Sequence, residues 1–376
     1  MNVPGPLRQQ DPPVPASRSP RGAARRAVVA AVAALATALA LLGCSAPVTQ
    51  DLTIALLLPE VKTARYEGVD RPAFVDAVAA TCATCTVLYA NAQQDAARQQ
   101  QQAESFLIRG ADVLVLAAVD AEAALGIVAE ATTRGVPVIA YDRFLEDPDV
   151  AYYISFDPGR VGQLQAQSLV DGLEERGITT GGVLLTYGAV TDANSPDLRR
   201  SVETVMAASD LTVLAETTIP DWSPDKAQEW VATQMSRYRD QVVGVYAAND
   251  GLAAGAISAI RAAGVTDMPL VTGQDAELAA VQRIVAGEQY MTVYKSIRQQ
   301  AQIAAGKAVS LARGEEIDAP TEVRGVPTML LSPVAVTLRD IEPVLVRQGV
   351  FGLDEICVEP YAQACAAAGL TEEELR

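Results

Sequence analysis

The feature that most constrains this chain is a regular alternation, from residue 51 onward, of short apolar runs with longer amphipathic ones. The short runs are rich in Val, Ile and Leu and have the length of buried strands, whereas the longer runs have helical spacing. Strands that alternate with helices form βαβ units, which place the strands parallel in one sheet. We therefore predict an α/β fold, and 376 residues with 50% hydrophobic content suffice for about two domains.

The expected elements form two series. In the first series, strands are expected at 52–58, 86–89, 113–117, 137–140 and 151–155, with helices near 74–80, 93–108 and 122–134. A break at Asp157-Pro158-Gly159 follows. In the second series, strands are expected at 183–186, 212–217, 242–247, 270–272 and 291–294, with helices near 160–176, 196–208, 224–239, 251–263 and 277–286. A helix at 297–311, a last strand at 330–336 and two short helical pieces complete the chain, which suggests that it crosses between two lobes more than once.

Residues 1–43 differ in composition from the rest of the chain. Five arginines precede an apolar run from Ala27 to Gly43, which is too short and too close to the N-terminus for an ordinary membrane span. We interpret residues 1–43 as a signal peptide for export. The run ends in Leu41-Leu42-Gly43-Cys44, which resembles the lipobox of bacterial lipoproteins, where the cysteine is acylated and becomes the first mature residue. The expected location is the outer face of the cytoplasmic membrane, with a lipid anchor on Cys44.

The chain is strongly acidic, with 46 Asp and Glu against 29 Lys and Arg and a formal charge of −17. Removal of residues 1–43, which hold five arginines and one aspartate, changes this charge to −21. Nucleic acids and anionic lipid surfaces require a positive face, so neither is an expected partner.

Four cysteines follow Cys44. An even number of cysteines in an exported chain favours disulfides, and we expect the two local pairs Cys82–Cys85 and Cys357–Cys365. Redox chemistry or zinc binding remains an alternative for the first pair. The chain has no histidine, which removes the commonest general base and metal ligand, so neither a metal nor a cofactor is expected.

Polar side chains follow five of the expected strands where each strand ends. Ligands of an open parallel sheet sit outside the carboxyl ends of its strands, so a binding site is expected there. These residues are Asp142, Arg143, Asp192, Asn194, Asn249, Asp250, Gln274, Asp275 and Lys295. They combine hydrogen-bond donors with acceptors, as the hydroxyls of a neutral sugar require. Two loops add an aromatic residue that could cover the apolar face of a sugar ring, namely Tyr66, beside Lys62 and Arg65, and Trp222.

Other roles remain open for these residues. Asp250 and Asp275 precede helices and could be N-caps, Arg143 and Lys295 could be surface charges or ion-paired, and Trp222 could close the edge of the core. An acidic pair such as Asp142 and Asp275 could act as the acid and base of a glycosidase. Arg143 and Lys295 would keep both carboxylates ionised, which does not suit a general acid.

With these segments, the chain resembles the periplasmic sugar-binding proteins of ABC transporters, particularly those that bind D-xylose. The resemblance spans about residues 52–350 and rests on segments 138–143, 153–157, 161–166, 249–250, 273–278 and 291–295. It implies a class I periplasmic-binding-protein fold, in which two Rossmann-like, doubly wound lobes are joined by a three-strand hinge around the sugar. The lobes would comprise 51–155 plus 296–330 and 156–295 plus 331–376.

By this resemblance, hydrogen bonds to the sugar would come from Arg143, Asn194, Asn249, Asp275 and Lys295, with Trp222 and Tyr66 as stacking residues and Arg65 and Lys62 beside them. The D-xylose-binding members usually have tryptophan where this chain has Tyr66. The implied function is that of a monomeric lipoprotein, not an enzyme, which captures a monosaccharide such as D-xylose by hinge closure and delivers it to the membrane permease of an ABC importer. The alternatives are another pentose or hexose, an exported sugar-modifying enzyme, and the effector domain of a LacI-type regulator. The last lacks support because a signal stands where a DNA-binding helix-turn-helix would be.

Overall fold

The computed structural model describes residues 51–371, together with residues 1, 5, 11–13 and 15. Cys44 and most of the expected signal peptide, 1–43, lie outside the described residues. Residues 51–371 form one compact unit. Within the described part of the chain, no helix combines the length and the apolar character needed to cross a membrane.

The first lobe is built on a seven-stranded sheet with the order β11-β12-β5-β4-β3-β1-β2, in which all neighbours except β11 and β12 are parallel. Its strands are β1 (Thr53–Leu58), β2 (Thr86–Asn91), β3 (Val113–Leu116), β4 (Val138–Tyr141), β5 (Val150–Phe156), β11 (Thr321–Val323) and β12 (Val326–Leu331). Its helices are η1 (Tyr66–Asp70), α2 (Arg71–Thr81), α3 (Ala96–Ile108), α4 (Leu125–Thr133) and α10 (Ile297–Ala312).

Strand β1 shows why the strands of this sheet are almost continuously apolar. Successive side chains of a strand point to opposite faces. Ile54 and Leu56 therefore pack with α2 and α10, whereas Ala55 and Leu57 pack with α3 and α4. A strand covered by helices on both faces has no polar side, as is usual in parallel sheets.

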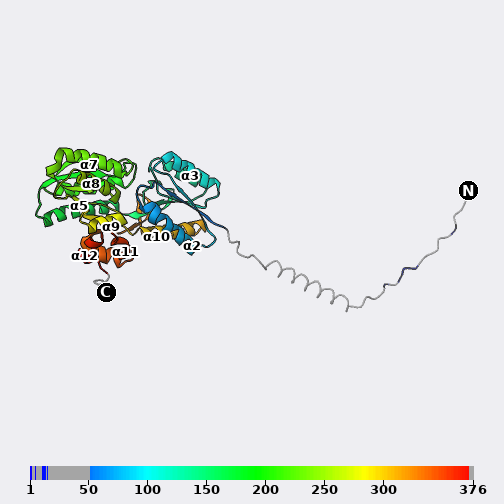
Figure 1. The fold of residues 1–376 in the computed structure, drawn as a ribbon. Helices are drawn as coiled ribbons and strands as arrows, with labels where there is room; N and C mark the ends of the chain where they lie inside the picture. Colours follow the sequence, from blue (N-terminus) through cyan, green and yellow to red (C-terminus); the bar gives the residue numbers. More distant parts are fainter. Residues whose placement is uncertain (2–4, 6–10, 14, 16–50, 372–376) are drawn as a thin grey trace. The chain divides into compact units, whose positions relative to one another are not determined.

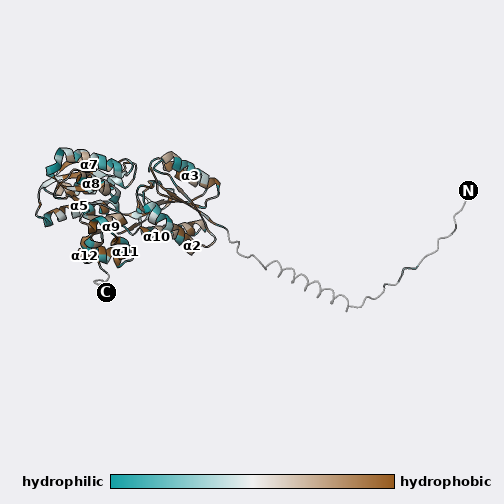
Figure 2. Cartoon of the chain, viewed as in Figure 1, coloured by the Kyte–Doolittle hydropathy of each residue, from teal (hydrophilic) through white to brown (hydrophobic). Residues whose placement is uncertain are grey.

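The second lobe contains a parallel four-stranded sheet with the order β7-β6-β8-β9. Its strands are β6 (Gly181–Tyr187), β7 (Leu211–Thr218), β8 (Val242–Ala247) and β9 (Leu270–Val271). An antiparallel pair, β10 (Met291–Tyr294) and β13 (Val334–Thr337), continues it, since Tyr290 N donates to Val271 O at 2.9 Å. The helices are α5 (Pro158–Glu175), α6 (Ser195–Ala208), α7 (Pro224–Tyr238), η2 (Arg239–Gln241), α8 (Asp250–Ala262) and α9 (Leu278–Val285). Figure 2 shows hydrophilic and hydrophobic residues mixed along α3 and α7, as expected of helices that bury one side.

The chain crosses between the two lobes three times: after β5, after β10, and between β12 and β13. The expected α/β fold with two doubly wound lobes and a three-strand hinge is therefore confirmed. The single strand expected at 330–336 is wrong, because β12 ends at Leu331, β13 begins at Val334, and the two strands belong to different sheets. Pro333 lies in the gap, where it cannot donate to a ladder.

The last described segment forms a small attachment to the second lobe. It consists of η3 (Leu338–Asp340), η4 (Ile341–Val346), α11 (Leu353–Ile356) and α12 (Ala362–Ala367). Ile341, Leu345 and Ile356 pack against the apolar side of α9, and Figure 1 shows α11 and α12 close to that helix. A disulfide joins Cys357 to Cys365 within this attachment, and another joins Cys82 to Cys85 between α2 and β2.

Candidate functional site

A small cavity of about 30 Å³ lies between the two lobes, at the carboxyl ends of their strands. Thirteen residues, nine at the strand ends and four in the two loops, were expected at the sugar site, and eleven of them line this cavity. The lining residues are Thr63, Arg65, Tyr66, Asp142, Arg143, Asp192, Asn194, Leu198, Trp222, Asn249, Gln274, Asp275 and Lys295. The exceptions are Asp250 and Lys62. The Nζ of Lys62 instead pairs with Asp221 Oδ2 of the second lobe at 2.5 Å.

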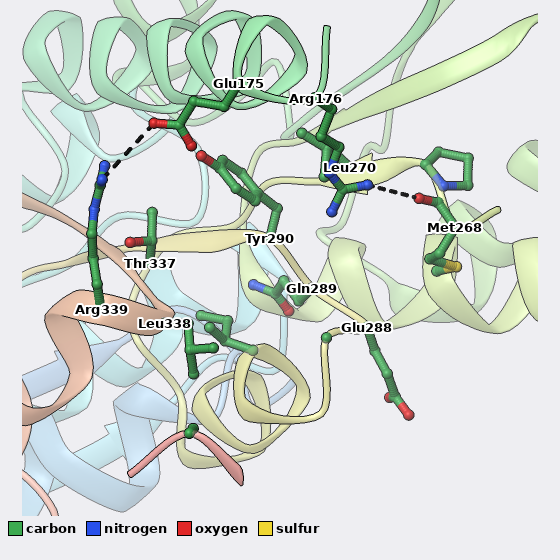
Figure 3. Close-up of a pocket in the computed structure, with 14 residues that line it drawn as sticks. Glu175, Arg176, Met268, Leu270, Glu288, Gln289, Tyr290, Thr337, Leu338 and Arg339 are labelled. Carbon is green, nitrogen blue, oxygen red and sulfur yellow. Dashed lines mark hydrogen bonds and ion pairs between the residues drawn. The ribbon is translucent and has the colours of Figure 1, made fainter. Parts of the chain in front are cut away.

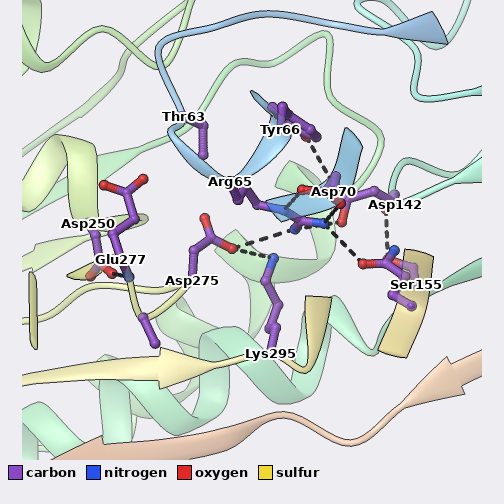
Figure 4. Close-up of polar contacts among 12 residues, drawn as sticks. Thr63, Arg65, Tyr66, Asp70, Asp142, Ser155, Asp250, Asp275, Glu277 and Lys295 are labelled. Atoms are coloured by element: carbon purple, nitrogen blue, oxygen red, sulfur yellow. Dashed lines mark hydrogen bonds and ion pairs between the residues drawn. The ribbon is translucent and has the colours of Figure 1, made fainter. Parts of the chain in front are cut away.

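Arg65 is the centre of a buried charge network (Figure 4). It is 3% exposed, and its guanidinium pairs with Asp70 at 2.8 Å and with Asp142 at 2.9 Å. The same guanidinium lies 3.6 Å from Asp275 of the second lobe. Because a buried charge requires partners, this loop of the first lobe is held by carboxylates from both sides of the cavity.

Asp142 is an ionised hydrogen-bond acceptor. Its Oδ2 accepts a hydrogen bond from Tyr66 Oη at 2.9 Å. Burial alone would raise the pKa of this carboxyl. The charges of Arg65, Lys295 and Arg143 outweigh burial and hold the pKa well below its usual range. A carboxyl with such a low pKa cannot supply the proton that a glycosidase acid must supply.

Arg143 connects the first lobe to the second. It is 2% exposed, its Nη1 donates to Ala118 O at 2.8 Å, and its Nε lies 3.0 Å from Asp192 Oδ2. Next to this pair, Asn194 Nδ2 donates to Asp142 O at 2.9 Å. The polar residues that follow β4 therefore contact those of the segment before α6 directly across the cavity.

Lys295 follows β10 at one of the three crossings and forms an ion pair with Asp275. Its Nζ lies 2.8 Å from Asp275 Oδ1 and 5.7 Å from the centre of the Phe156 ring. Lys295 and Arg143 are thus both buried and ion-paired rather than surface charges.

Asn249, not Asp250, caps α8, which corrects the expectation for Asp250. Asn249 Oδ1 accepts from Leu252 N at 2.8 Å, so its amide nitrogen is directed elsewhere. Asp250 is fully buried, and its Oδ1 accepts hydrogen bonds from Gln289 at 2.8 Å and from Thr292 at 2.9 Å. Asp250 thus holds elements of the second lobe together and does not line the cavity.

Asp275 likewise is not a cap, because Glu277 holds the N-cap position of α9.

Three lining residues have left-handed backbone: Asp142 with φ 65°, Trp222 with φ 53° and Asp275 with φ 95°. This conformation is uncommon for residues other than glycine and costs about 1–3 kcal/mol each. Strain of this kind is typical of functional sites, because it directs a side chain into a site that regular backbone would point it away from.

Each lobe contributes one buried aromatic ring to the cavity. Tyr66 comes from η1 of the first lobe and is 3% exposed, and Trp222 comes from the loop before α7 and is 5% exposed. The Trp222 ring lies directly on the backbone of Gly188, where an added Cβ would come within 2.0 Å of the ring. Trp222 therefore both packs into the core of the second lobe and lines the cavity.

Two lining residues, Thr63 and Leu198, were not among the expected ones. Leu198 lies four residues after Asn194 on α6, so helical spacing places it on the same side as Asn194. The expected site was defined by polar residues at strand ends, so the apolar side chain of Leu198 was not identified from the sequence. Thr63 lies in the loop after β1, where its backbone N–H donates to Glu60 Oε2 at 3.0 Å.

A larger hollow of about 470 Å³ lies within the second lobe alone, at the amino end of β9 (Figure 3). Arg339 and Glu175 face each other there at 3.8 Å, and Arg176 donates to Met268 O at 3.5 Å. It lacks residues from the first lobe and lies away from the strand ends that carry the buried charges. Among the described residues, no group of three His, Cys, Asp or Glu side chains could hold a metal ion.

Comparison with known proteins is consistent with this architecture. Residues 54–316 match the model of the periplasmic binding protein domain. Two proteins named D-xylose-binding periplasmic protein, from Haemophilus influenzae and Escherichia coli, are 34% and 32% identical over 80% of this chain and 91% of theirs. A multiple sugar-binding periplasmic receptor of Rhizobium radiobacter is 33% identical over 70% of this chain and 81% of its own. The solved structure of a carbohydrate transporter solute binding protein from Chloroflexus aurantiacus, in complex with D-glucose, has a TM-score of 0.73 and 27% identity over 81% of this chain and 98% of its own.

Proposed function

Because this chain belongs to the periplasmic binding protein family, we propose that it captures a monosaccharide, D-xylose, outside the cytoplasm and delivers it to the permease of an ABC importer. The observation that carries this proposal is the convergence of side chains from both lobes on one cavity. The cavity offers carboxylate acceptors, cationic donors, amides that can do both, and two aromatic rings, which together match the hydroxyls and the apolar face of a sugar.

Capture follows from the division of the site between the lobes. A sugar that touches Arg143 of the first lobe and Asp275 of the second stabilises the closed form through contacts that an open form lacks. The moving bodies would be 51–155 plus 296–330 and 156–295 plus 331–376. They would rotate about the three crossings between them.

The role proposed is that of a binding protein and not an enzyme. Two observations support this: the low pKa of Asp142 does not suit a glycosidase acid, and the chain has no histidine, the commonest general base. We further propose that the mature protein is a monomer held to the outer face of the membrane through lipid on Cys44, within reach of the permease.

Calorimetry of the chain without residues 1–44 against D-xylose, L-arabinose, D-ribose and D-glucose tests the proposal. We expect D-xylose to bind with a stoichiometry of about one and to be recovered unchanged. Asp275→Ala should abolish the heat, because it leaves Lys295 buried without its closest partner and removes an acceptor from the cavity. Asp76→Ala, at an exposed position on α2, is the matched control and should bind normally. Absence of binding by every sugar, or chemical conversion of a sugar, would refute the proposal.

A further inference from the structure

Leu198 is the one aliphatic side chain among the described residues that line the cavity. The other lining residues are polar, charged or aromatic. Leu198 lies in the first turn of α6, and its backbone N–H donates to Asn194 O at 3.1 Å. It therefore presents an apolar surface next to one of the amides expected to bind a sugar.

The position of Leu198 is fixed by packing on the side away from the cavity. It belongs to a small core cluster with Phe156, Val161, Met291 and Val293, and it is 5% exposed. Gly162 of α5 lies so close that an added Cβ would come within 2.5 Å of Leu198 O. With the backbone pressed against α5 and the side chain within a core cluster, Leu198 has little freedom to move away from a ligand.

The apolar surface of Leu198 has a chemical counterpart in an aldopentose ring. In the pyranose form of an aldopentose, each ring carbon carries a hydroxyl except one, which is a CH2 group. In the corresponding aldohexose that carbon carries a hydroxymethyl group. A hydroxymethyl against Leu198 would have its hydroxyl buried without a hydrogen-bond partner, whereas a CH2 group has no such requirement.

We infer that Leu198 is a specificity-determining residue that faces the ring CH2 of a pentose and excludes hexoses. This inference rests on the proposed function, since it assigns a part of the sugar to one wall of the same cavity. The polar residues around it would bind the hydroxyls that pentoses and hexoses share, so they cannot make this distinction.

The test compares the affinities of D-xylose and D-glucose, which differ only by the hydroxymethyl group. Leu198→Asn places a donor and an acceptor at the same branch point, and we expect the ratio of xylose affinity to glucose affinity to fall by about tenfold or more. Leu198→Met keeps the wall apolar and should leave glucose excluded. Val202→Ala removes apolar volume from the next turn of the same helix, where the side chain is buried in the core of the second lobe, and should leave the ratio unchanged.

Leu198→Ala provides a second variant in case asparagine prevents folding, which a thermal melt will show. It creates room for the hydroxymethyl group, so glucose affinity should rise relative to xylose affinity. The inference is overturned if the wild-type chain binds glucose as tightly as xylose, or if a folded variant with asparagine or alanine at position 198 keeps the wild-type ratio. Failure of the wild-type chain to bind any monosaccharide would instead refute the proposed function itself.

Discussion

The buried residues of the cavity depend on one another through charge. Arg65, Arg143 and Lys295 are each nearly inaccessible, and each pairs with an aspartate. Removal of one partner from such a pair leaves an uncompensated buried charge, which costs more than the pair itself contributes. Substitutions of these residues therefore affect both stability and binding. Gly188 lies against the uncharged ring of Trp222, so a substitution at position 188 tests the effect of packing without a change of charge.

We expect Gly188→Ala to displace Trp222. The added Cβ would approach the indole ring to 2.0 Å, and overpacking of this kind costs about 1–3 kcal/mol of stability. If Trp222 covers the sugar, the affinity should also fall by about tenfold, since aromatic contacts contribute about 1 kcal/mol or more. Urea denaturation and calorimetry provide the two measurements.

Gly306→Ala is the matched control for Gly188→Ala. Gly306 lies within α10 and has open space around its Cβ position, so alanine should stabilise the chain slightly and leave binding unchanged. If Gly188→Ala left both stability and affinity unchanged, the contact between the Trp222 ring and Gly188 would contribute to neither.

At the scale of the elements, the loops of the two lobes touch directly as well as through the cavity. Lys62 pairs with Asp221 at 2.5 Å, and Ala64 N donates to Glu277 Oε1 at 3.2 Å. On another loop, Thr191 Oγ1 donates to Val119 O at 3.1 Å. These direct contacts between the lobes stabilise the closed arrangement independently of the sugar. They should therefore slow the release of a bound sugar.

We expect Lys62→Ala to increase the dissociation rate of the sugar by up to about fivefold. The Lys62 side chain is 38% exposed, and a pair this accessible contributes about 0–1 kcal/mol. Stopped-flow fluorescence at low and high salt measures the effect, which should shrink as salt screens the pair in the wild-type chain.

Lys226→Ala is the control for Lys62→Ala, because Lys226 pairs with the same Asp221 oxygen at 3.0 Å but lies in the second lobe. It should leave the dissociation rate nearly unchanged. Equal effects of the two variants would mean that Asp221 acts within its own lobe and not as a contact between lobes.

At the scale of the whole molecule, buried acids with shifted pKa values determine how stability depends on pH. Burial and the charge of Asp250 raise the pKa of Glu277 to about 8. Burial raises the pKa of Asp250 to about 7, although Arg283 opposes it. Asp275, itself held by Lys295 and Arg65, adds negative charge beside both. Asp142, with its low pKa, titrates only in strong acid.

We expect the free energy of unfolding to fall as the pH rises from about 5 to about 8. Over this range the folded chain holds protons on Asp250 and Glu277 that the unfolded chain, with ordinary carboxyl pKa values, has already released. The slope is at most about 1.4 kcal/mol per pH unit for each titrating group. Urea denaturation at several pH values measures it.

Glu277→Gln should flatten this slope, because it removes one of the titrating groups, whereas Glu229→Gln at an exposed position of α7 should not. A stability that rises between these pH values, or a slope that Glu277→Gln leaves unchanged, would contradict the raised pKa values.

The sequence by itself determined the class of fold and the edge of the sheet at which polar residues gather. Strand β1 is identified by a short continuous apolar run and helix α5 by helical periodicity, and both patterns depend only on neighbouring residues. Parallel connections then place the carboxyl ends of successive strands of a sheet at one edge, so the order of strands and helices along the chain is enough to predict that Asn249 and Asp275 of the second lobe share one site.

Only the tertiary structure decided which residues meet across the cavity and what each one does there. Lys62 finds its partner 159 residues further along the chain, and Asp250 finds Thr292 42 residues further on. Leu198 looks in the sequence like any core residue of an amphipathic helix. Pairing, burial and the pKa values that follow from them depend on the distances and solvent access that packing of the two lobes creates. A local pattern carries no record of those distances.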